Sequence, residues 1–539
     1  RDRYNSDVRK SVENLLRTSL GAFSIDTASR VGEHTHARLH IVARTAEPVT
    51  LTDEMIQAIR AGVAQAARSW DDNFADTVLE TLGERDGARL LRNWMGRFTP
   101  GYQADHSAER AVADAQLCES MHASGQREFV TLAPHSSGGR SSHLFSLFTT
   151  GEPVLLSAVL PLLHNLGVTV VDERPYELLD ATGRNLRLYE FGIDLPAGST
   201  STDTLPARFA EAFLAAWRGE TENFYLDAVV TCHGMTARQA TILRAYARYL
   251  RQTTLSFSMR YLEEIVLAHP VIAQALIELF EVRLDPARDA DRESESQRLN
   301  TLLSDELQRV VSLDADRILR GLVALVNATL RTNAYLRDDS GALRPYLSFK
   351  LDSQSLGGLL PSPLPFVEIW VCSPIVEGVH LRFGRVARGG LRWSDRRDDV
   401  RTEVLGLVKA QMVKNTVIVP VGAKGGFVVQ HPVAAAQDRL AQGVDCYQTF
   451  IRGLMDLTDN VVDGQVVSPV AVVRHDGDDP YLVVAADKGT ATFSDIANAI
   501  SADYGFWLAD AFASGGSGDR KSTRLNSSHE WISRMPSSA

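Results

Sequence analysis

Cysteine is scarce in this chain of 539 residues, and long apolar runs are absent. The cysteines lie far apart and form no C-x-x-C pair, which excludes a disulfide-rich scaffold and a cysteine-based zinc site. No apolar run reaches the ~18 residues that a membrane-spanning helix needs. We therefore expect reduced thiols in a cytoplasmic protein, with no metal and no membrane partner. The four cysteines are Cys118, Cys232, Cys372 and Cys446.

Positive charge is also in deficit. The chain has 56 Lys and Arg residues against 67 Asp and Glu residues, a formal net charge of −11. An acidic balance argues against a general nucleic-acid partner. With 44% apolar and 23% charged residues, the composition is that of a globular protein, and the length predicts three or four domains.

Glycine motifs that bind nucleotides are missing as well. No G-x-G-x-x-G follows a predicted strand, so the chain shows no dinucleotide-binding turn. The segment Gly422–Gly426 is rich in glycine but lacks the G-x-x-x-x-G-K-[ST] spacing of a phosphate-binding loop. The sequence therefore identifies no residue that binds a cofactor.

Both ends of the chain are unusual. It starts at Arg1 rather than at methionine, and Asp519–His529 resembles the translation of a common sequencing adapter. We expect 519–539 to be an artefact tail outside the fold, and the natural protein to continue at both ends.

Two similar orders of elements occur in the first 206 residues. Hydrophobic periodicity predicts helix, strand, strand, helix over residues 1–82, with one long helix at Leu51–Leu82. Over 121–206 it predicts four strands and one helix, with an antiparallel pair at Val168–Asp172 and Leu186–Ile193, and a second helix follows at Ala207–Arg218. Such βαββα-like units are typical of ferredoxin-like modules, whose helices cover one face of an antiparallel sheet.

The rest of the chain changes character near residue 341. Residues 207–340 are predicted to be mostly helical, because apolar stripes recur at helical spacing. In 341–518 strands and helices alternate, which indicates an α/β domain. The predicted strands there are Phe366–Cys372, Val379–Phe383, Thr416–Val421, Val470–Val473 and Tyr481–Ala485, and the predicted helices are Arg397–Val413, Cys446–Val462 and Ser494–Ser501.

Cationic side chains stand beside glycine pairs twice between residues 388 and 427. Glycine pairs let the backbone turn tightly or approach a ligand closely. Cations at such places suit a small anionic substrate. The candidate site residues are Arg388 with Gly389 and Gly390, Lys414 at the end of a helix, Lys424 before a glycine pair, and Asp487 after an apolar strand.

Each of these side chains also has a structural interpretation, as a solvated cation, a helix cap or an ion-pair partner. The ion pairs open to Arg388 and Arg392 are those with Asp395, Asp398 and Asp399.

Four elements in a fixed order resemble the large, multidomain NAD-specific bacterial glutamate dehydrogenase family. They are Gly389–Arg392, Lys414–Asn415, Lys424–Gly426 and Asp487–Thr490. Any one of them alone would be a weak signal, but the order of all four is specific. Arg388 stands where the smaller glutamate dehydrogenases usually have a lysine. Residues 1–340 resemble the family's ACT-like modules and helical region.

The resemblance implies an α/β and α+β multidomain protein. Its expected parts are an ACT-like module with a helical extension over 1–120, a second ACT-like module over 121–206, and a helical region over 207–340. An incomplete substrate-binding domain of the catalytic region follows over 341–518. The Rossmann domain is expected to be mostly missing, and the chain alone is expected to be inactive.

The resemblance also implies NAD-dependent oxidative deamination of L-glutamate to 2-oxoglutarate and ammonium. Arg388 and Lys414 would bind the two carboxylates. Lys424 would activate water or polarise the carbonyl, and Asp487 would carry protons. The protein would be a homo-oligomer that takes an amino-acid regulator at its ACT-like modules.

Two other functions stay open. A dehydrogenase of another amino acid would share most of the site, although a second cation for a distal carboxylate argues against an apolar substrate. A non-catalytic sensor would use the ferredoxin-like modules to bind an amino acid. A Gly-rich strand–turn–helix further along the gene would favour the enzyme.

Overall fold

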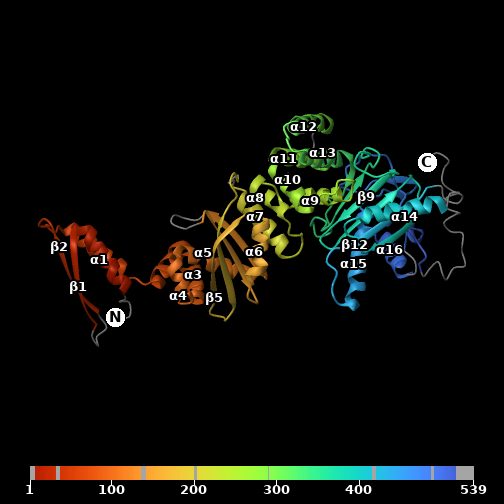
Figure 1. Ribbon diagram of the computed structural model, residues 1–539. Coiled ribbons are helices and arrows are strands. Elements are labelled where there is room, and N and C mark those ends of the chain that lie inside the picture. Colours follow the sequence, from red (N-terminus) through yellow and green to blue (C-terminus); the bar gives the residue numbers. More distant parts are fainter. Residues whose placement is uncertain are drawn as a thin grey trace. The chain divides into compact units, whose positions relative to one another are not determined.

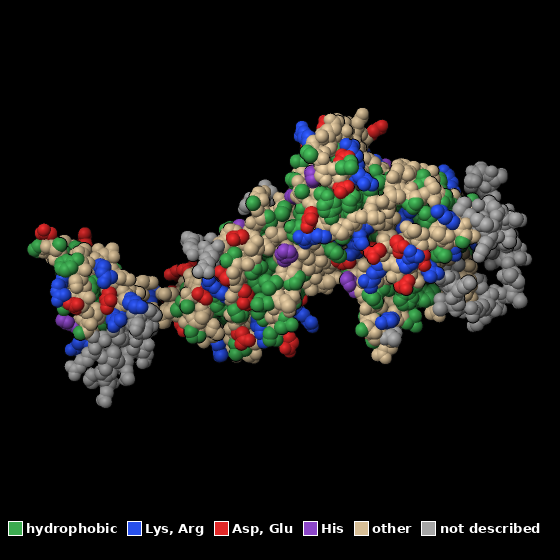
Figure 2. Space-filling model, viewed as in Figure 1, with side chains coloured by type: hydrophobic (Ala, Val, Ile, Leu, Met, Phe, Trp, Pro, Cys, Tyr) green, Lys and Arg blue, Asp and Glu red, His purple; other side chains and the backbone are tan. Residues whose placement is uncertain are grey.

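The computed structural model describes residues 6–31, 37–134, 141–199, 203–288, 291–414, 421–486 and 491–516 (Figure 1). Contacts divide the chain into two compact units. The first consists of 1–131, 145–153 and 172–191, and the second of 132–144, 154–171 and 192–539. In Figure 2, acidic and basic side chains are intermingled on the face in view, without an extended patch of one sign.

The N-terminal elements follow the predicted order, but the predicted long helix is two helices. α1 (Ser6–Leu20), β1 (Ala22–Val31), β2 (Ala37–Thr45) and α2 (Asp53–Ala66) come first, and β1 and β2 pair antiparallel. The break has a local cause. Ser69 starts α3 (Trp70–Trp94) with a capping box, in which its hydroxyl accepts from the Asp72 backbone N–H.

Three helices of the first unit share one apolar core. Residues from α3, α4 (Pro100–Asp105) and α5 (Ala108–Ser124) pack around buried aromatic rings. Trp94 is 1% exposed, and it stacks on Phe98 with the ring centroids 5.7 Å apart. Tight aromatic packing of this kind fixes the helices relative to one another.

The second predicted module has the expected strands. β3 (Glu128–Pro134), β4 (His143–Thr150), β5 (Thr169–Leu179) and β6 (Asn185–Asp194) form one sheet in the order β3-β4-β6-β5. Helices α6 (Leu156–Asn165) and α7 (Leu205–Trp217) follow β4 and β6. A strand β6 placed between β4 and β5 is the arrangement of a ferredoxin-like split βαββ unit, as predicted.

The next region is helical up to residue 328. Its elements are η1 (Tyr225–Ala228), α8 (Val229–His233), α9 (Ala237–Arg251), α10 (Met259–Ala268), α11 (Pro270–Leu284), α12 (Arg292–Leu307) and α13 (Leu313–Ala328). Within the described ranges no single helix is long and apolar enough to cross a membrane; α10 and α11 would pass only together, and they are bent by 98°.

An eight-stranded sheet dominates the C-terminal half, in the order β16-β15-β11-β12-β10-β9-β8-β7. The first four strands pair parallel, and the pairs from β12 to β7 are antiparallel. The strand bounds are β7 Thr329–Thr332, β8 Leu347–Leu351, β9 Val367–Cys372, β10 Val376–Arg382, β11 Gly389–Ser394, β12 Ala423–Val429, β15 Val484–Ala486 and β16 Ala513–Ser514. Because β7 belongs to this sheet, the sheet begins inside the range predicted to be helical.

Helices cover both faces of the sheet. α15 (Ala436–Met455) and α16 (Ala491–Asp503) pack on one face, where Ile369 and Val371 of β9 join their apolar core. Trp370 lies between these two residues in β9, so its side chain points to the other face. There it packs against Tyr249 of α9, with the ring centroids 5.6 Å apart. α14 (Val400–Lys414) covers that second face over β12.

Several predicted elements shift or fail. Val470–Val473 is not a strand, and a short hairpin of β13 (Asn460–Val462) and β14 (Gln465–Val467) precedes it. The helix predicted at Cys446–Val462 begins ten residues earlier and ends at Met455. The strand predicted at Thr416–Val421 lies mostly outside the described residues, and the described strand begins at Ala423.

Candidate active site

Two parallel strands carry the predicted cations. Leu391 of β11 is registered with Gly425 of β12, and Arg392 with Gly426. Arg388 forms an isolated parallel bridge with Gly422, and its carbonyl accepts from the Ala423 backbone N–H at 3.3 Å. Arg388 therefore lies one strand away from Lys424 and two residues before its row.

Both cations fall on the face that α14 covers. A Cβ added at Gly426 would meet Val404 of α14, and the Arg392 Nε lies 2.7 Å from Glu403 of the same helix. Side chains alternate along a strand, so Lys424 lies on the same face as Gly426, and Arg388 on the same face as Arg392. The strand spacing and rise place the Arg388 and Lys424 Cα atoms about 8 Å apart.

Gly390 of β11 lies directly beside Lys424, in the same row of the sheet. It precedes the Leu391–Gly425 pair on β11 and is registered with Ala485 of β15 on its other side. Gly389, Gly390 and Lys424 are all half-buried. Since Gly390 has no side chain, no β11 side chain stands next to Lys424 in this row of the sheet.

The glycines after Lys424 serve packing rather than a turn. Gly425 and Gly426 lie inside β12, whereas the sequence suggested a tight turn after a strand. A Cβ at Gly425 would come within 2.4 Å of the Leu391 Cδ2, and one at Gly426 within 2.6 Å of the Val404 Cγ2. These glycines let β11 and α14 approach β12 closely, which sets the position of Lys424.

The other two predicted residues are only partly placed. Lys414 is the last residue of α14, whose first turns lie over Gly426. α14 follows β11 and precedes the parallel strand β12, which begins nine residues after Lys414, so α14 runs back along the strands toward the end where Arg388 lies. The Lys414 side chain is not among the described groups. Asp487 follows β15, the neighbour of β11, and lies outside the described residues.

The acidic partner of β11 is one that the sequence did not suggest. Glu403 of α14 accepts from the Ser394 hydroxyl and pairs with Arg392. The three aspartates considered for Arg392 are Asp395, Asp398 and Asp399; two of them pair elsewhere, Asp398 with Arg251 and Asp399 with Arg396. Glu403 belongs to the first turn of α14, the helix that follows β11. This position is the feature of the sequence that could have identified Glu403 as the partner of Arg392.

The opposite face of the sheet carries a buried cluster of ion pairs. Arg331 Nη1 lies 2.7 Å from Asp459, and its Nε lies 2.6 Å from Asp476. Lys350 Nζ lies 2.6 Å from Asp479, which also pairs with Arg382. The side chains of Arg331 and Asp459 are fully buried. The members come from distant parts of the sequence, so no local pattern predicted the cluster.

The buried cluster fixes the chain that leads into β15. Burial lowers the pKa of Lys350, and Arg331 and Arg382 act in the same direction, while Asp476 and Asp479 oppose them. Asp476 and Asp479 belong to the loop before β15, and the Tyr481 backbone carbonyl accepts from Arg382. Within the described part of the chain, no group of three or more His, Cys, Asp or Glu residues could hold a metal ion.

Family models match most of the chain. The model "Bacterial NAD-glutamate dehydrogenase, catalytic domain" matches residues 302–534, which include every candidate site residue. Four further glutamate dehydrogenase models match the remainder: ACT2 domain at 1–71, helical motif 2 at 77–121, ACT3 domain at 132–205 and helical motif 3 at 221–286.

Curated relatives agree with these models. The chain is 43% identical over 543 aligned residues to the NAD-specific glutamate dehydrogenase of Pseudomonas aeruginosa, and 42% identical to that of Halomonas elongata. Both alignments cover 99% of this chain and 33% of the relative. The enzyme of the same name from Mycobacterium tuberculosis is 41% identical, over 96% of this chain and 33% of the relative.

The chain thus spans about a third of the length of the curated relatives it matches. The matched domains follow one another along it in the order ACT2, helical motif 2, ACT3, helical motif 3 and catalytic domain. With its ACT, helical-motif and catalytic domains, the chain belongs to the bacterial NAD-specific glutamate dehydrogenase family.

Proposed function

We propose that the protein to which this chain belongs oxidises L-glutamate to 2-oxoglutarate and ammonium with NAD. The observation that carries the proposal is the register of β11 and β12. It puts Arg388 and Lys424 on one face of adjacent strands, with the bare Gly390 directly beside Lys424. Three relatives at 41–43% identity are named NAD-specific glutamate dehydrogenase.

The two carboxylates of glutamate need two separated cations. Arg388, at the start of β11, can grip one carboxylate with two parallel N–H donors. Lys414, at the end of α14, supplies a point charge for the other. The half-buried Gly389 and Gly390 let the substrate lie against the strand backbone.

Lys424 is the residue nearest to the reacting carbon in this proposal. As a neutral amine it takes a proton from the water that attacks the substrate imine, and as an ammonium it polarises the carbonyl of 2-oxoglutarate. Asp487 moves a proton to and from the amino nitrogen. The packing of Gly425 and Gly426 holds the Lys424 backbone in a rigid strand, as a positioned acid–base group requires.

The described residues offer no glycine-rich turn between a strand and a helix that would fit a dinucleotide. The nicotinamide would accept the hydride, and no residue of this chain is assigned to it. We place the Rossmann domain in the part of the relatives' length that this chain does not span, and we expect the chain alone to be inactive. A cytoplasmic location, a homo-oligomeric state and an amino-acid regulator at the ACT-like modules belong to the same proposal.

A test uses the full-length gene product. Purified enzyme should reduce NAD with L-glutamate, and residues 1–518 alone should not. Preference for another amino acid over glutamate would favour a dehydrogenase of different specificity. Binding of an amino acid without any NAD reduction would favour the non-catalytic sensor.

A further inference from the structure

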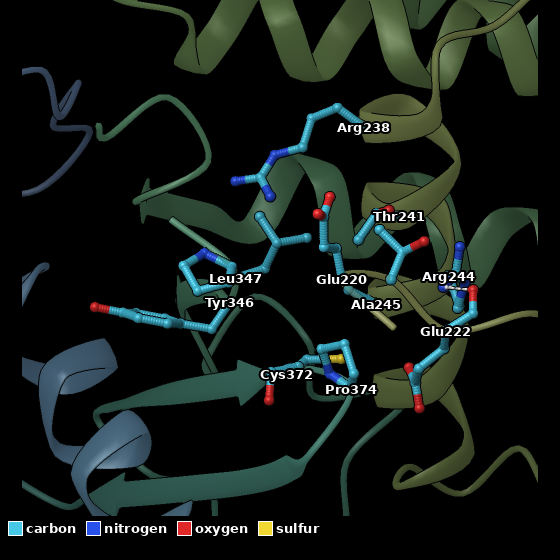
Figure 3. Close-up of a pocket in the computed structure, with 13 residues that line it drawn as sticks. Glu220, Glu222, Arg238, Thr241, Arg244, Ala245, Tyr346, Leu347, Cys372 and Pro374 are labelled. Carbon is cyan, nitrogen blue, oxygen red and sulfur yellow. Dashed lines mark hydrogen bonds between the residues drawn. The ribbon is translucent and has the colours of Figure 1, made fainter. Parts of the chain in front are cut away.

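Helix α9 contacts the eight-stranded sheet near both of its ends. Near its start, Figure 3 shows Thr241 and Arg244 lining a small pocket beside Cys372, the last residue of β9. Near its end, Tyr249 and Gln252 are buried and bond to β9 and to the start of α14. α9 lies in the range that the helical motif 3 model matches, whereas β9 and α14 lie in the range of the catalytic-domain model.

A buried ion pair joins β9 to α14. The Arg401 Nε of α14 lies 2.9 Å from a carboxylate oxygen of Glu368 in β9, and both side chains are fully buried. The Tyr249 hydroxyl donates to the other oxygen of Glu368. Burial acts to lower the pKa of Arg401, but the charge of Glu368 outweighs it and raises the pKa, so the guanidinium stays charged. Tyr249 thus orients the carboxylate that holds Arg401.

Gln252, the residue after α9, holds the backbone at the start of α14. Its side-chain NH2 group donates to the Arg397 carbonyl oxygen at 3.1 Å, and its Oε1 accepts from the Arg401 backbone N–H at 3.2 Å. The N–H groups in the first turn of a helix have no partner within the helix, so this amide satisfies one of them. α9 therefore holds the same end of α14 through a side chain and through the backbone.

The buried ion pair lies on the face of the sheet that carries Lys424. Glu368 is registered with Leu381 of β10, and Leu381 is registered with Lys424 of β12. Registered residues of antiparallel strands share a face, so Glu368 and Lys424 stand in one row. Two strand spacings separate them, which is about 10 Å. The anchor of α14 is therefore close to the candidate active site but outside it.

α14 has this anchor at one end and Lys414 at the other. At ~1.5 Å per residue, Arg401 and Lys414 are about 20 Å apart along the helix. Between them Val404 packs on Gly426 of β12, and an apolar contact has no preferred direction. The directional bonds at Arg401 fix the rotation and the axial position of α14. Because a helix is rigid, they also fix the position of Lys414.

We propose that Tyr249 and Gln252 are positioning residues for the candidate active site. Through Arg401 they set the position of α14, and α14 sets the position of Lys414. The inference rests on the proposed function, in which Lys414 binds one carboxylate of the substrate. It makes α9, a helix of the helical-motif range, a working part of the catalytic unit, because a shift of about 1 Å in a substrate-binding group is enough to impair an enzyme.

The first test asks whether α9 holds α14, and it needs no enzymatic activity. Hydrogen exchange is measured in the whole chain for Tyr249→Phe and Gln252→Met, which nearly keep the size of the buried side chain. Each should speed exchange of the α14 amides at least about threefold, with those of α16 within about twofold. Thr241→Val, in the pocket of Figure 3, is the control on α9 and should leave α14 unchanged. Unchanged exchange in α14, or equal acceleration in α14 and α16, overturns the proposal.

The second test measures substrate binding in the full-length enzyme. Gln252→Met should raise the KM for glutamate about tenfold, with kcat changed less than about threefold and the KM for NAD unchanged, because the Lys414 charge acts throughout the reaction. In a Lys414→Ala background the same change should raise the KM by no more than about twofold, since the group that it positions is gone. Independent effects of the two changes overturn the proposal. A wild-type enzyme that does not reduce NAD with glutamate contradicts the proposed function instead, and the exchange measurement still decides whether α9 holds α14.

Discussion

Two sites on the eight-stranded sheet, the buried ion-pair cluster and Lys424, use cations in opposite ways. On the face of α15 and α16, Arg331, Lys350 and Arg382 are buried and paired with aspartates. On the face of α14, Lys424 is half-buried and has no ion pair with any described carboxylate. A buried cation that is fully paired with carboxylates maintains the folded structure. A cation without such a partner, beside a glycine that has no side chain, is available to a substrate.

The backbone beside the cations differs in the same way. The buried cluster lies among the large side chains of the antiparallel strands. Lys424 is followed by two glycines and is flanked by Gly390 on the next strand. We expect the bulky neighbours to exclude a ligand from the buried cluster, and the missing side chains beside Lys424 to leave room for one. Single substitutions that change either a charge or the packing at one position test this contrast.

The largest expected effect is on turnover. In the full-length enzyme, Lys424→Ala should lower kcat by roughly 10²–10⁴ while protein stability changes little, because the lost group acts on the reaction. Lys424→Arg should not restore activity, since a guanidinium stays protonated. Steady-state kinetics gives the answer, with Lys409→Ala on the exposed face of α14 as the matched control. A kcat within about threefold of wild type in either Lys424 variant would contradict the assignment.

The buried face should respond in stability instead. Arg331→Met leaves Asp459 without its main partner in the interior and should cost about 3–5 kcal/mol of unfolding free energy. The control, Arg320→Met, removes an exposed pair with Asp316 and should cost under about 1 kcal/mol. Urea denaturation of the two variants gives the difference. Equal midpoints would show that the cluster adds no stability beyond that of a surface pair.

The sequence predicted the elements better than their ends. Ala22–Val31 matches β1, because alternation along an exposed hairpin is a local property. The helix predicted at Leu51–Leu82 contains a break at Ser69, and only the cap geometry reveals it. The sequence predicted no strand around Lys424, and the strand predicted at Thr416–Val421 lies mostly outside the described residues. β12 gains its partners β10 and β11 from outside the local window, and tertiary pairing decided where it begins.

The sequence predicted those parts of the site that depend on the order of residues along the chain. It did not predict those that depend on which strands and helices lie next to one another in the fold. Arg388, the glycines and Lys424 were found because their motif order is local. That Arg388 and Lys424 share one face follows only from the register of β11 and β12. The ion pair between Arg392 and Glu403, and the contact of Val404 with Gly426, likewise require the observed packing of α14 on β12.

A third test concerns the glycines of β12, the strand that carries Lys424. Gly426→Ala would bring a Cβ within 2.6 Å of the Val404 Cγ2, so α14 must shift, at a cost of about 1–3 kcal/mol. Gly406 of α14 is the matched control. Its added Cβ would meet nothing within 4 Å, so Gly406→Ala should stabilise the helix by up to about 1 kcal/mol. Thermal melting of both variants measures the two effects. Opposite signs are expected, and a stabilised Gly426→Ala would refute the packing argument.

The smallest effect is expected at Arg388, and it separates binding from chemistry. Arg388 is proposed to hold a carboxylate that keeps its charge throughout the reaction, so its loss weakens the ground state and the transition state alike. Arg388→Ala in the full-length enzyme should therefore raise the KM for glutamate about tenfold, with kcat changed by less than about threefold. Arg388→Lys should recover part of the loss, since a point charge remains but the second parallel hydrogen bond does not. Arg385→Ala, an exposed neighbour on the same connection, should leave the KM unchanged. A fall in kcat at constant KM in Arg388→Ala would move this residue from substrate binding to the reaction itself, and the division of roles between Arg388 and Lys424 would have to be reversed.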